Sequence, residues 1–369
     1  GISLSILLLS SCGDGAGTGS FILPFTSAKP SASPSVAVAE NPSNTNPGAT
    51  PNAPKTFKEP ITEDKSPSPL VQVQSYEKMM RALKDGDFEY INKEFSAGGL
   101  KLAATRAEGE FKDYPITLNI NSVTSNMGLF GLASKNVTAA NQQDKVAVVE
   151  KTLQNIVIYS IRSTINKLIE NNKMGLTDDQ YTTDVSKALT IYFYGNPGAV
   201  ATEFSLAKLA QKVDADTVQK TNKSFDTLLS GIGLALSKPK DINDLLLAKT
   251  QIDLGFLKML YMSSLNELSE AVLTRDLSNV TESEYLYLGI KNMLKASNNT
   301  ETFAVESVFL NPLSGINYPR FQKSLDVGIL ERAQEELKLG LEKISKDNKA
   351  AQNHALAAKL YVDIINCNY

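Results

Sequence analysis

The chain has 369 residues, of which 42% are hydrophobic, and its 37 basic and 40 acidic residues leave a formal net charge of −3. A chain of this length can bury a sizeable core, and its basic residues are interspersed with acids, which argues against nucleic acid as a partner. With one His and no Trp, it lacks the imidazoles that most zinc and di-iron sites require.

The first residues resemble a bacterial lipoprotein signal peptide. An apolar run from Ile2 to Leu9 is followed by Ser10, Ser11 and Cys12, and the four positions that end at the cysteine resemble a lipobox. The run is far shorter than the ~20 residues that span hydrocarbon, which argues against a transmembrane helix. Neither a Met nor a basic segment precedes the run, so we expect the natural chain to begin further upstream.

Lipidation of Cys12 would place the protein in the cell envelope, because several acyl chains hold a protein on a bilayer far better than one. Gly13, rather than Asp, follows the cysteine. By resemblance to enterobacterial sorting, this favours the outer membrane. We expect the protein to be lipid-anchored and to face the periplasm or the exterior.

The segment from Gly13 to Leu70 is rich in Pro, Ser, Asn and Ala, and contains ten of the chain's 15 prolines. Such a composition cannot bury enough apolar surface to offset the entropy of ordering, so it predicts a disordered tether. As a flexible coil, the tether would span roughly 40–45 Å. Its Gly-rich start at Gly13 resembles a phosphate-binding loop but lacks the flanking strand and helix, so we interpret it as spacer.

After Ser75 the sequence has the three-and-four spacing of amphipathic helices, which predicts an all-α fold of about ten helices. One apolar stripe comprises Val149, Leu153, Ile156, Val157, Ile161, Ile165 and Leu168. A second comprises Leu254, Leu257, Tyr261, Leu265, Leu268 and Val272. A third comprises Leu330, Ala333, Leu337, Leu341 and Ile344. The only strand-like alternation, at Ile116, Leu118 and Ile120, is interpreted as an extended loop.

Turn and capping residues indicate where helices begin and end. Thr177 with Gln180 and Thr281 with Glu284 have the spacing of capping boxes, which predicts a helix start at each threonine. Gly195-Asn196-Pro197 predicts a helix end.

A weak internal repeat favours a tandem duplication of antiparallel helical bundles. Lys151-Thr opens one long helix and Lys249-Thr opens another, and the two Thr-x-x-Gln/Glu segments, about a hundred residues apart, each lead a second helix. Each copy then contains a Phe-centred helix, at Ala201–Phe204 and at Ala304–Phe309, and a long helix that ends near Ser237-Lys238 or Ser345-Lys346. The alternative is a coincidence between two capped hairpins. The predicted segments are the signal peptide 1–11, the lipidated Cys and linker 12–70, a helical segment 71–143, repeat units 144–240 and 241–346, and a terminal helix 347–369.

Carboxylates are the remaining candidates for metal ligands, because hard cations take oxygen ligands. Glu331 and Glu335 stand one helical turn apart, so their side chains leave the same side of the helix. The alternative is a solvated acidic face, which is common on helices.

His354 shares a helical face with Ala357, Tyr361 and Ile364, which favours a satisfied core or boundary residue. Cys367 is left over once Cys12 is lipidated, and either it is buried or it links to another chain.

The lipobox, spacer and duplicated helices together resemble lipoproteins related to the algal Fe-assimilating, high-CO2-inducible periplasmic proteins. The layout is also similar to that of imelysin-like envelope proteins, although their Gly-x-His-x-x-Glu motif is missing around His354. The resemblance implies an envelope protein of iron acquisition, but no functional residue carries over from either family. Ferric iron is the candidate metal at Glu331 and Glu335 because it takes oxygen ligands, and the chain cannot supply soft or imidazole-rich sites. The competing hypothesis is a non-enzymatic scaffold lipoprotein that binds an envelope protein.

The lipobox gives a direct prediction. Cys12→Ser should release the protein from the membrane, because the residue that carries the lipid is gone. Fractionation and acyl labelling of cells that express the chain with a complete leader measure this. A variant that stays in the membrane fraction with unchanged mass would contradict the lipoprotein interpretation.

Overall fold

The computed structural model describes residues 67–97, 99–111, 142–175, 179–216, 223–291, 293–294, 305, 307–309 and 317–366. These residues fall within the unit from Ser66 to Tyr369. They form helices and no strand, which confirms the all-α prediction. The signal peptide with Cys12, most of the tether, the alternation at 116–120 and Cys367 lie outside the described residues.

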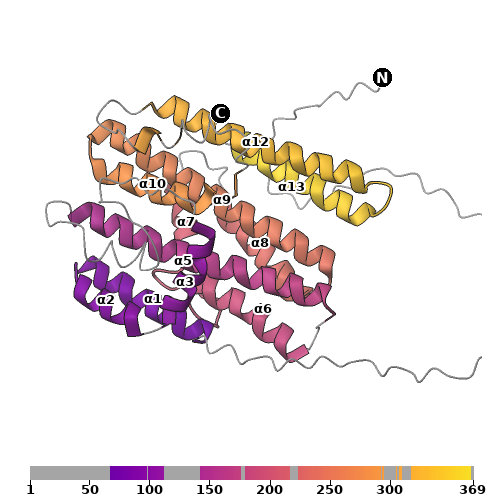
Figure 1. The fold of residues 1–369 in the computed structure, drawn as a ribbon, viewed down its shortest axis with the longest axis horizontal. Coiled ribbons are helices and arrows are strands. Elements are labelled where there is room, and N and C mark those ends of the chain that lie inside the picture. Colours follow the sequence, from indigo (N-terminus) through magenta and orange to yellow (C-terminus); the bar gives the residue numbers. More distant parts are fainter. Residues whose placement is uncertain are drawn as a thin grey trace, which may run out of the picture. The chain divides into compact units, whose positions relative to one another are not determined.

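Figure 1 shows the helices in chain order, from indigo to yellow. The first half contains α1 (Pro69–Lys84), α2 (Phe88–Ala97), α3 (Gly99–Phe111), α5 (Gln142–Lys173), α6 (Asp179–Tyr194) and α7 (Leu206–Asp216). The second half contains α8 (Ser224–Ser237), α9 (Ile242–Thr274), α10 (Leu277–Lys291), α12 (Tyr318–Lys343) and α13 (Asn348–Asn366). None of them is both long enough and apolar enough to cross a membrane.

Helix α1 begins slightly before the predicted end of the tether at residue 70. Ser68 is its N-cap and accepts a hydrogen bond from the backbone N–H of Val71, while Pro69 occupies the first turn. Pro is favoured there because the N–H that it lacks would have no helical partner.

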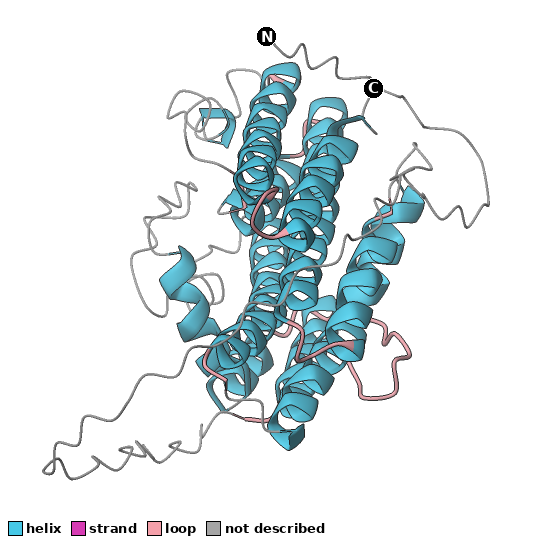
Figure 2. Ribbon diagram, turned by 90° about the vertical axis from the view of Figure 1, so that its right-hand side faces the viewer, coloured by secondary structure: helices cyan, strands magenta, loops and turns pink. Residues whose placement is uncertain are grey.

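The two longest helices, α5 and α9, contact each other and most of the remaining helices. The predicted stripe on α5 is buried along its whole length. The stripe on α9 is buried from Leu254 to Leu268, whereas Val272 is exposed. Helix α9 also buries residues on its other faces, because α5, α8, α10 and α13 all pack against it. Figure 2 shows several long helices running alongside one another.

The third stripe lies along α12, which confirms the predicted helix, but most of the stripe is outside the core. Ala333 is buried, but Leu330, Leu337, Leu341 and Ile344 are 42%, 46%, 70% and 63% exposed. Helix α12 packs chiefly on α13, and only slightly on α9. One side of the stripe therefore has no helix of the described chain against it.

Four predicted helix positions are wrong. Lys151 and Lys249 lie inside α5 and α9, which begin at Gln142 and Ile242. Thr281 lies buried inside α10, whose first turn is instead capped by Asp276, since its Oδ1 accepts a hydrogen bond 2.9 Å long from the N–H of Ser278. Phe204 belongs to a turn, and α7 begins at Leu206. Thr177 lies outside the described residues, while the predicted stop after Tyr194 is confirmed, with Gly195 at φ +80°.

The helix lengths are compatible with the predicted duplication, which stays a prediction. Helices α5 and α9 have 32 and 33 residues, and α6 and α10 have 16 and 15. The closing helices differ more, because α8 has 14 residues and α12 has 26.

Small residues allow α8 to approach α9 closely. A Cβ atom added to Gly231 would lie 2.8 Å from the backbone oxygen of Ala248 and 2.9 Å from Cγ1 of Ile252. Backbone atoms cannot rotate away as a side chain can, so the two helices would have to separate. In contrast, a Cβ atom at Gly233, on the same helix, would meet no atom within 4 Å.

These two glycines give a matched pair of substitutions. Gly231→Ala should lower the free energy of unfolding by about 1–3 kcal/mol through overpacking. Gly233→Ala should raise it by about 1 kcal/mol, because Ala is the better helix former. Urea denaturation followed by circular dichroism measures both. Equal effects of the two substitutions would contradict the close α8–α9 contact.

Candidate functional site

The predicted metal ligands Glu331 and Glu335 lie one turn apart on α12, and both are partly buried. Glu335 Oε2 lies 2.7 Å from Nη1 of Arg332, so an arginine of the same helix pairs with this carboxylate. Among the described residues, no group of three or more His, Cys, Asp or Glu side chains is arranged to hold a metal ion. Iron ligation by Glu331 and Glu335 stays a prediction.

His354 of α13 contacts a carboxylate of α12. Its Nδ1 lies 2.7 Å from Oε2 of Glu336, and both side chains are mostly buried. Gly340 of α12 passes close to the same place, because a Cβ atom there would lie 3.3 Å from the Cβ of His354. His354 thus helps to join the two C-terminal helices.

A cluster of charged side chains lies where α5, α9 and α10 meet, and we call it the Lys151 cluster. It comprises Glu150 and Lys151 of α5, Glu267 of α9 and Glu282 of α10. Lys151 is buried, with its Nζ 2.9 Å from Oε2 of Glu282 and 3.2 Å from Oε1 of Glu150. Burial alone would lower the pKa of Lys151, but the two carboxylates outweigh it and the pKa is raised. The lysine is therefore a permanent positive charge that joins α5 to α10.

Glu267 is the member of the Lys151 cluster that gains and loses its proton near neutral pH. Burial raises its pKa, and Glu282, Glu270 and Glu150 raise it further, while Lys151 lowers it; the result is a pKa of about 7. Three carboxylates thus compete for one buried ammonium group, and the proton on Glu267 reduces their repulsion.

A second ionic contact joins α5 to α9. Asp253 Oδ1 lies 2.8 Å from Nε of Arg162, and Lys249 contacts the other carboxylate oxygen. Burial alone would raise the pKa of Asp253, but these two cations hold it below its ordinary value. Asp253 is therefore ionised at neutral pH and holds α5 against α9.

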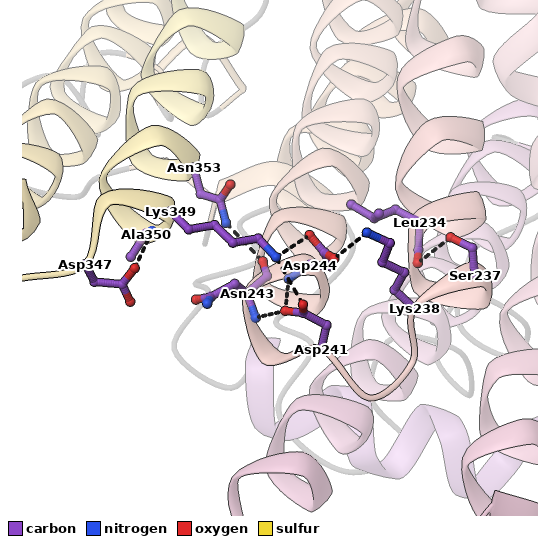
Figure 3. A network of polar contacts seen from close by, with 10 residues as sticks. All are labelled: Leu234, Ser237, Lys238, Asp241, Asn243, Asp244, Asp347, Lys349, Ala350 and Asn353. Atoms are coloured by element: carbon purple, nitrogen blue, oxygen red, sulfur yellow. Dashed lines mark hydrogen bonds and ion pairs between the residues drawn. The ribbon is translucent and has the colours of Figure 1, made fainter. Parts of the chain in front are cut away.

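A third polar network, shown in Figure 3, attaches α13 to the connection between α8 and α9. Lys349 Nζ lies 3.0 Å from Asp241 and 3.1 Å from Asp244, and Asp244 also pairs with Lys238 at 3.2 Å. Asp241 caps α9, while Asn353 Nδ2 donates a 3.0 Å hydrogen bond to a backbone oxygen at the start of that helix.

The three networks share one property, which is that each joins helices to one another. Sequence reasoning did not single out Glu267, Glu282 or Asp253, because each has a partner on another helix at a distant position in the chain. The signal that could have indicated them is a charged residue at a position otherwise expected to be buried. The exposed apolar stripe of α12 differs from these networks, because it lies at the surface.

Glu267 makes stability depend on pH. Its pKa is 4.5 in an exposed chain and about 7 in the folded one, so the folded state binds the proton more tightly. The contribution of Glu267 to the free energy of unfolding is fully present below pH 4.5 and is lost as the pH rises through about 7. The Gln of the Glu267→Gln variant cannot ionise, so this loss should not occur in the variant. At pH 8 its free energy of unfolding should exceed that of the parent by about 1–2 kcal/mol, after allowance for the partial exposure of the side chain.

Urea denaturation at several values between pH 5 and pH 8 measures this dependence. Glu342→Gln, at an exposed position of α12, is the control and should reproduce the parent profile. A Glu267→Gln profile that also falls like that of the parent would contradict the role of the Lys151 cluster.

The chain matches no known protein-family model, no curated protein sequence and no solved structure. The resemblance to iron-related envelope lipoproteins stays a prediction.

Proposed function

We propose that this chain is a lipid-anchored, non-enzymatic binding protein of a bacterial cell envelope, and that α12 presents its binding surface. The observation that carries the proposal is the exposure of Leu330, Leu337 and Leu341 along one face of α12, continued by its C-cap residue Ile344. Burial of a large apolar side chain stabilises an association by about 1.5–3 kcal/mol. Four such side chains in line are a surface from which a partner would exclude water.

The arrangement of these four residues distinguishes them from other exposed apolar side chains. Met174, Val200 and Leu273 are also exposed, but they lie at the end of a helix or in a connection, and Leu229 and Leu236 of α8 form only a pair. Single exposed apolar residues are normal on protein surfaces, whereas a continuous apolar patch indicates a contact site.

The charged networks support a binding role in a different way. Each of the three networks connects helices: the Lys151 cluster, the Asp253 contact and the Lys349 network. They therefore fix the relative positions of the helices that support α12. The proposed tether adds reach, because a flexible segment of roughly 40–45 Å allows a domain to meet partners while it stays anchored.

Site-specific photo-crosslinking tests the proposed binding surface. A photoreactive residue at Leu337 or Leu341 should give crosslinked products in native cells, because those positions would lie against a partner. The same residue at Leu273 or Val200, which are 80% and 71% exposed, is the control and should give few. Equal crosslinking at all four positions, or none at Leu337 and Leu341, would contradict the proposal.

A further inference from the structure

The exposed stripe of α12 also includes two residues that are not exposed leucines or isoleucines. Gln334 is polar and lies between Leu330 and Leu337, and Val327 is half-buried and precedes Leu330. From Val327 to Ile344 the positions that share this face are separated by alternating steps of three and four residues. These positions, which we call the α12 seam, are Val327, Leu330, Gln334, Leu337, Leu341 and Ile344. This is the heptad spacing with which one helix packs along another in a coiled coil. The seam is about 26 Å long at 1.5 Å per residue.

The two flanks of the α12 seam differ. On one flank are the small residues Ala333 and Gly340, which are buried where α13 packs. A Cβ atom on Gly340 would lie 3.3 Å from the backbone oxygen of Ala351 in α13. On the other flank are Glu331 and Lys338, which have opposite charges and stand seven residues apart. An incoming helix therefore meets α13 on one side and this charge pair on the other.

An antiparallel second copy of α12 fits both the seam and its open flank. Antiparallel pairing sets Val327 against Ile344 of the second copy, Leu330 against its Leu341, and Gln334 against its Leu337, and the two-fold axis repeats each layer. The same axis sets Glu331 of each copy beside Lys338 of the other, because equivalent flanks meet in an antiparallel pair. Glu331 already has a contact within its own chain, and a carboxylate accepts more than one hydrogen bond.

A parallel second copy fits less well. It would set Gln334 against Gln334 in the middle of the seam, and would direct Glu331 and Lys338 toward the flank that α13 covers in the other copy. The charge pattern and the covered flank therefore favour the antiparallel arrangement.

We infer that the occupant of the α12 seam is a second copy of this chain, paired antiparallel through α12. This inference rests on the proposed function, since it names the partner of the same surface. A seam of this length associates weakly in dilute solution, and anchoring both copies in one membrane would raise their effective concentration. A polar residue in the middle of a coiled-coil seam lowers stability but fixes register, and Gln334 occupies that place here.

Sedimentation velocity on the full chain with Cys12→Ser, from micromolar to submillimolar concentration, tests the pairing. The parent should show a reversible monomer–dimer equilibrium. Lys338→Glu alone sets two acidic pairs across the axis, and Glu331→Lys alone sets two basic pairs. Each should raise the dissociation constant roughly tenfold, the effect of turning two exposed ion pairs into repulsions.

The decisive sample is an equimolar mixture of these two single variants. In a mixed dimer every lysine again meets a glutamate, so the mixture should associate as the parent does. The double variant, with both charges exchanged, should do the same. Circular dichroism melting of each variant shows whether the fold is kept, and Leu341→Glu with Leu273→Glu as its control tests the apolar layers in the same assay.

Three outcomes would overturn the inference: a parent that stays monomeric, single variants that associate unchanged, or a mixture no better than its components. The proposed function has a separate test. Crosslinked products at Leu341 with a mass other than twice that of the chain would keep α12 as a binding surface while removing self-pairing. The absence of any product at Leu341 would remove the proposed function itself.

Discussion

The burial of α9 on nearly every side is the constraint on which the rest of the structure depends. Four helices pack closely against α9, and α7 and α12 also contact it, so the neighbouring helices need either small residues or matched polar groups where they meet it. Against α8 the contact is thin at Gly255, where a Cβ atom would lie 2.5 Å from Cγ of Leu228. Against α10, Ser264 and Ser283 each donate a hydrogen bond to the other's backbone oxygen. Shape and hydrogen bonding thus set the distances at which the neighbouring helices lie.

Buried charge complements this packing, although it contributes little net stability. Taking an ammonium and a carboxylate out of water costs about as much as their attraction returns. The pair between Lys151 and Glu282 instead fixes the alignment of α5 with α10, because a shift of one helix along the other would leave a buried charge without its partner. Asp253 and Arg162 act in the same way between α9 and α5. Apolar contacts hold the helices together, and the ions determine their alignment.

The sequence predicted the helical class and the inward faces of the two long helices, because a regular apolar stripe is a local property of the chain. Thr281 failed as a predicted cap because its Thr-x-x-Glu spacing occurs inside a helix that burial stabilises. The spacing at Leu337 and Leu341 predicted a helix but not the exposure of its stripe, because spacing indicates a face and not what covers it. Glu267 was missed because its environment is made by other helices, a property that no short segment contains.

The attachment of the C-terminal hairpin has a consequence for motion. Helix α12 is joined to the remaining helices mostly through α13, and α13 is itself fastened at its first turns by Lys349 and Asn353. Local opening follows the weakest boundary, so the more exposed part of α12 from Gln334 to Lys343 would open before the part with Phe321 and Ile329, which are fully buried. The amide hydrogens of the more exposed part would then exchange together, on the microsecond-to-second scale of segmental opening. The surface that binds would also be the part of the fold with the most freedom to adjust to its partner.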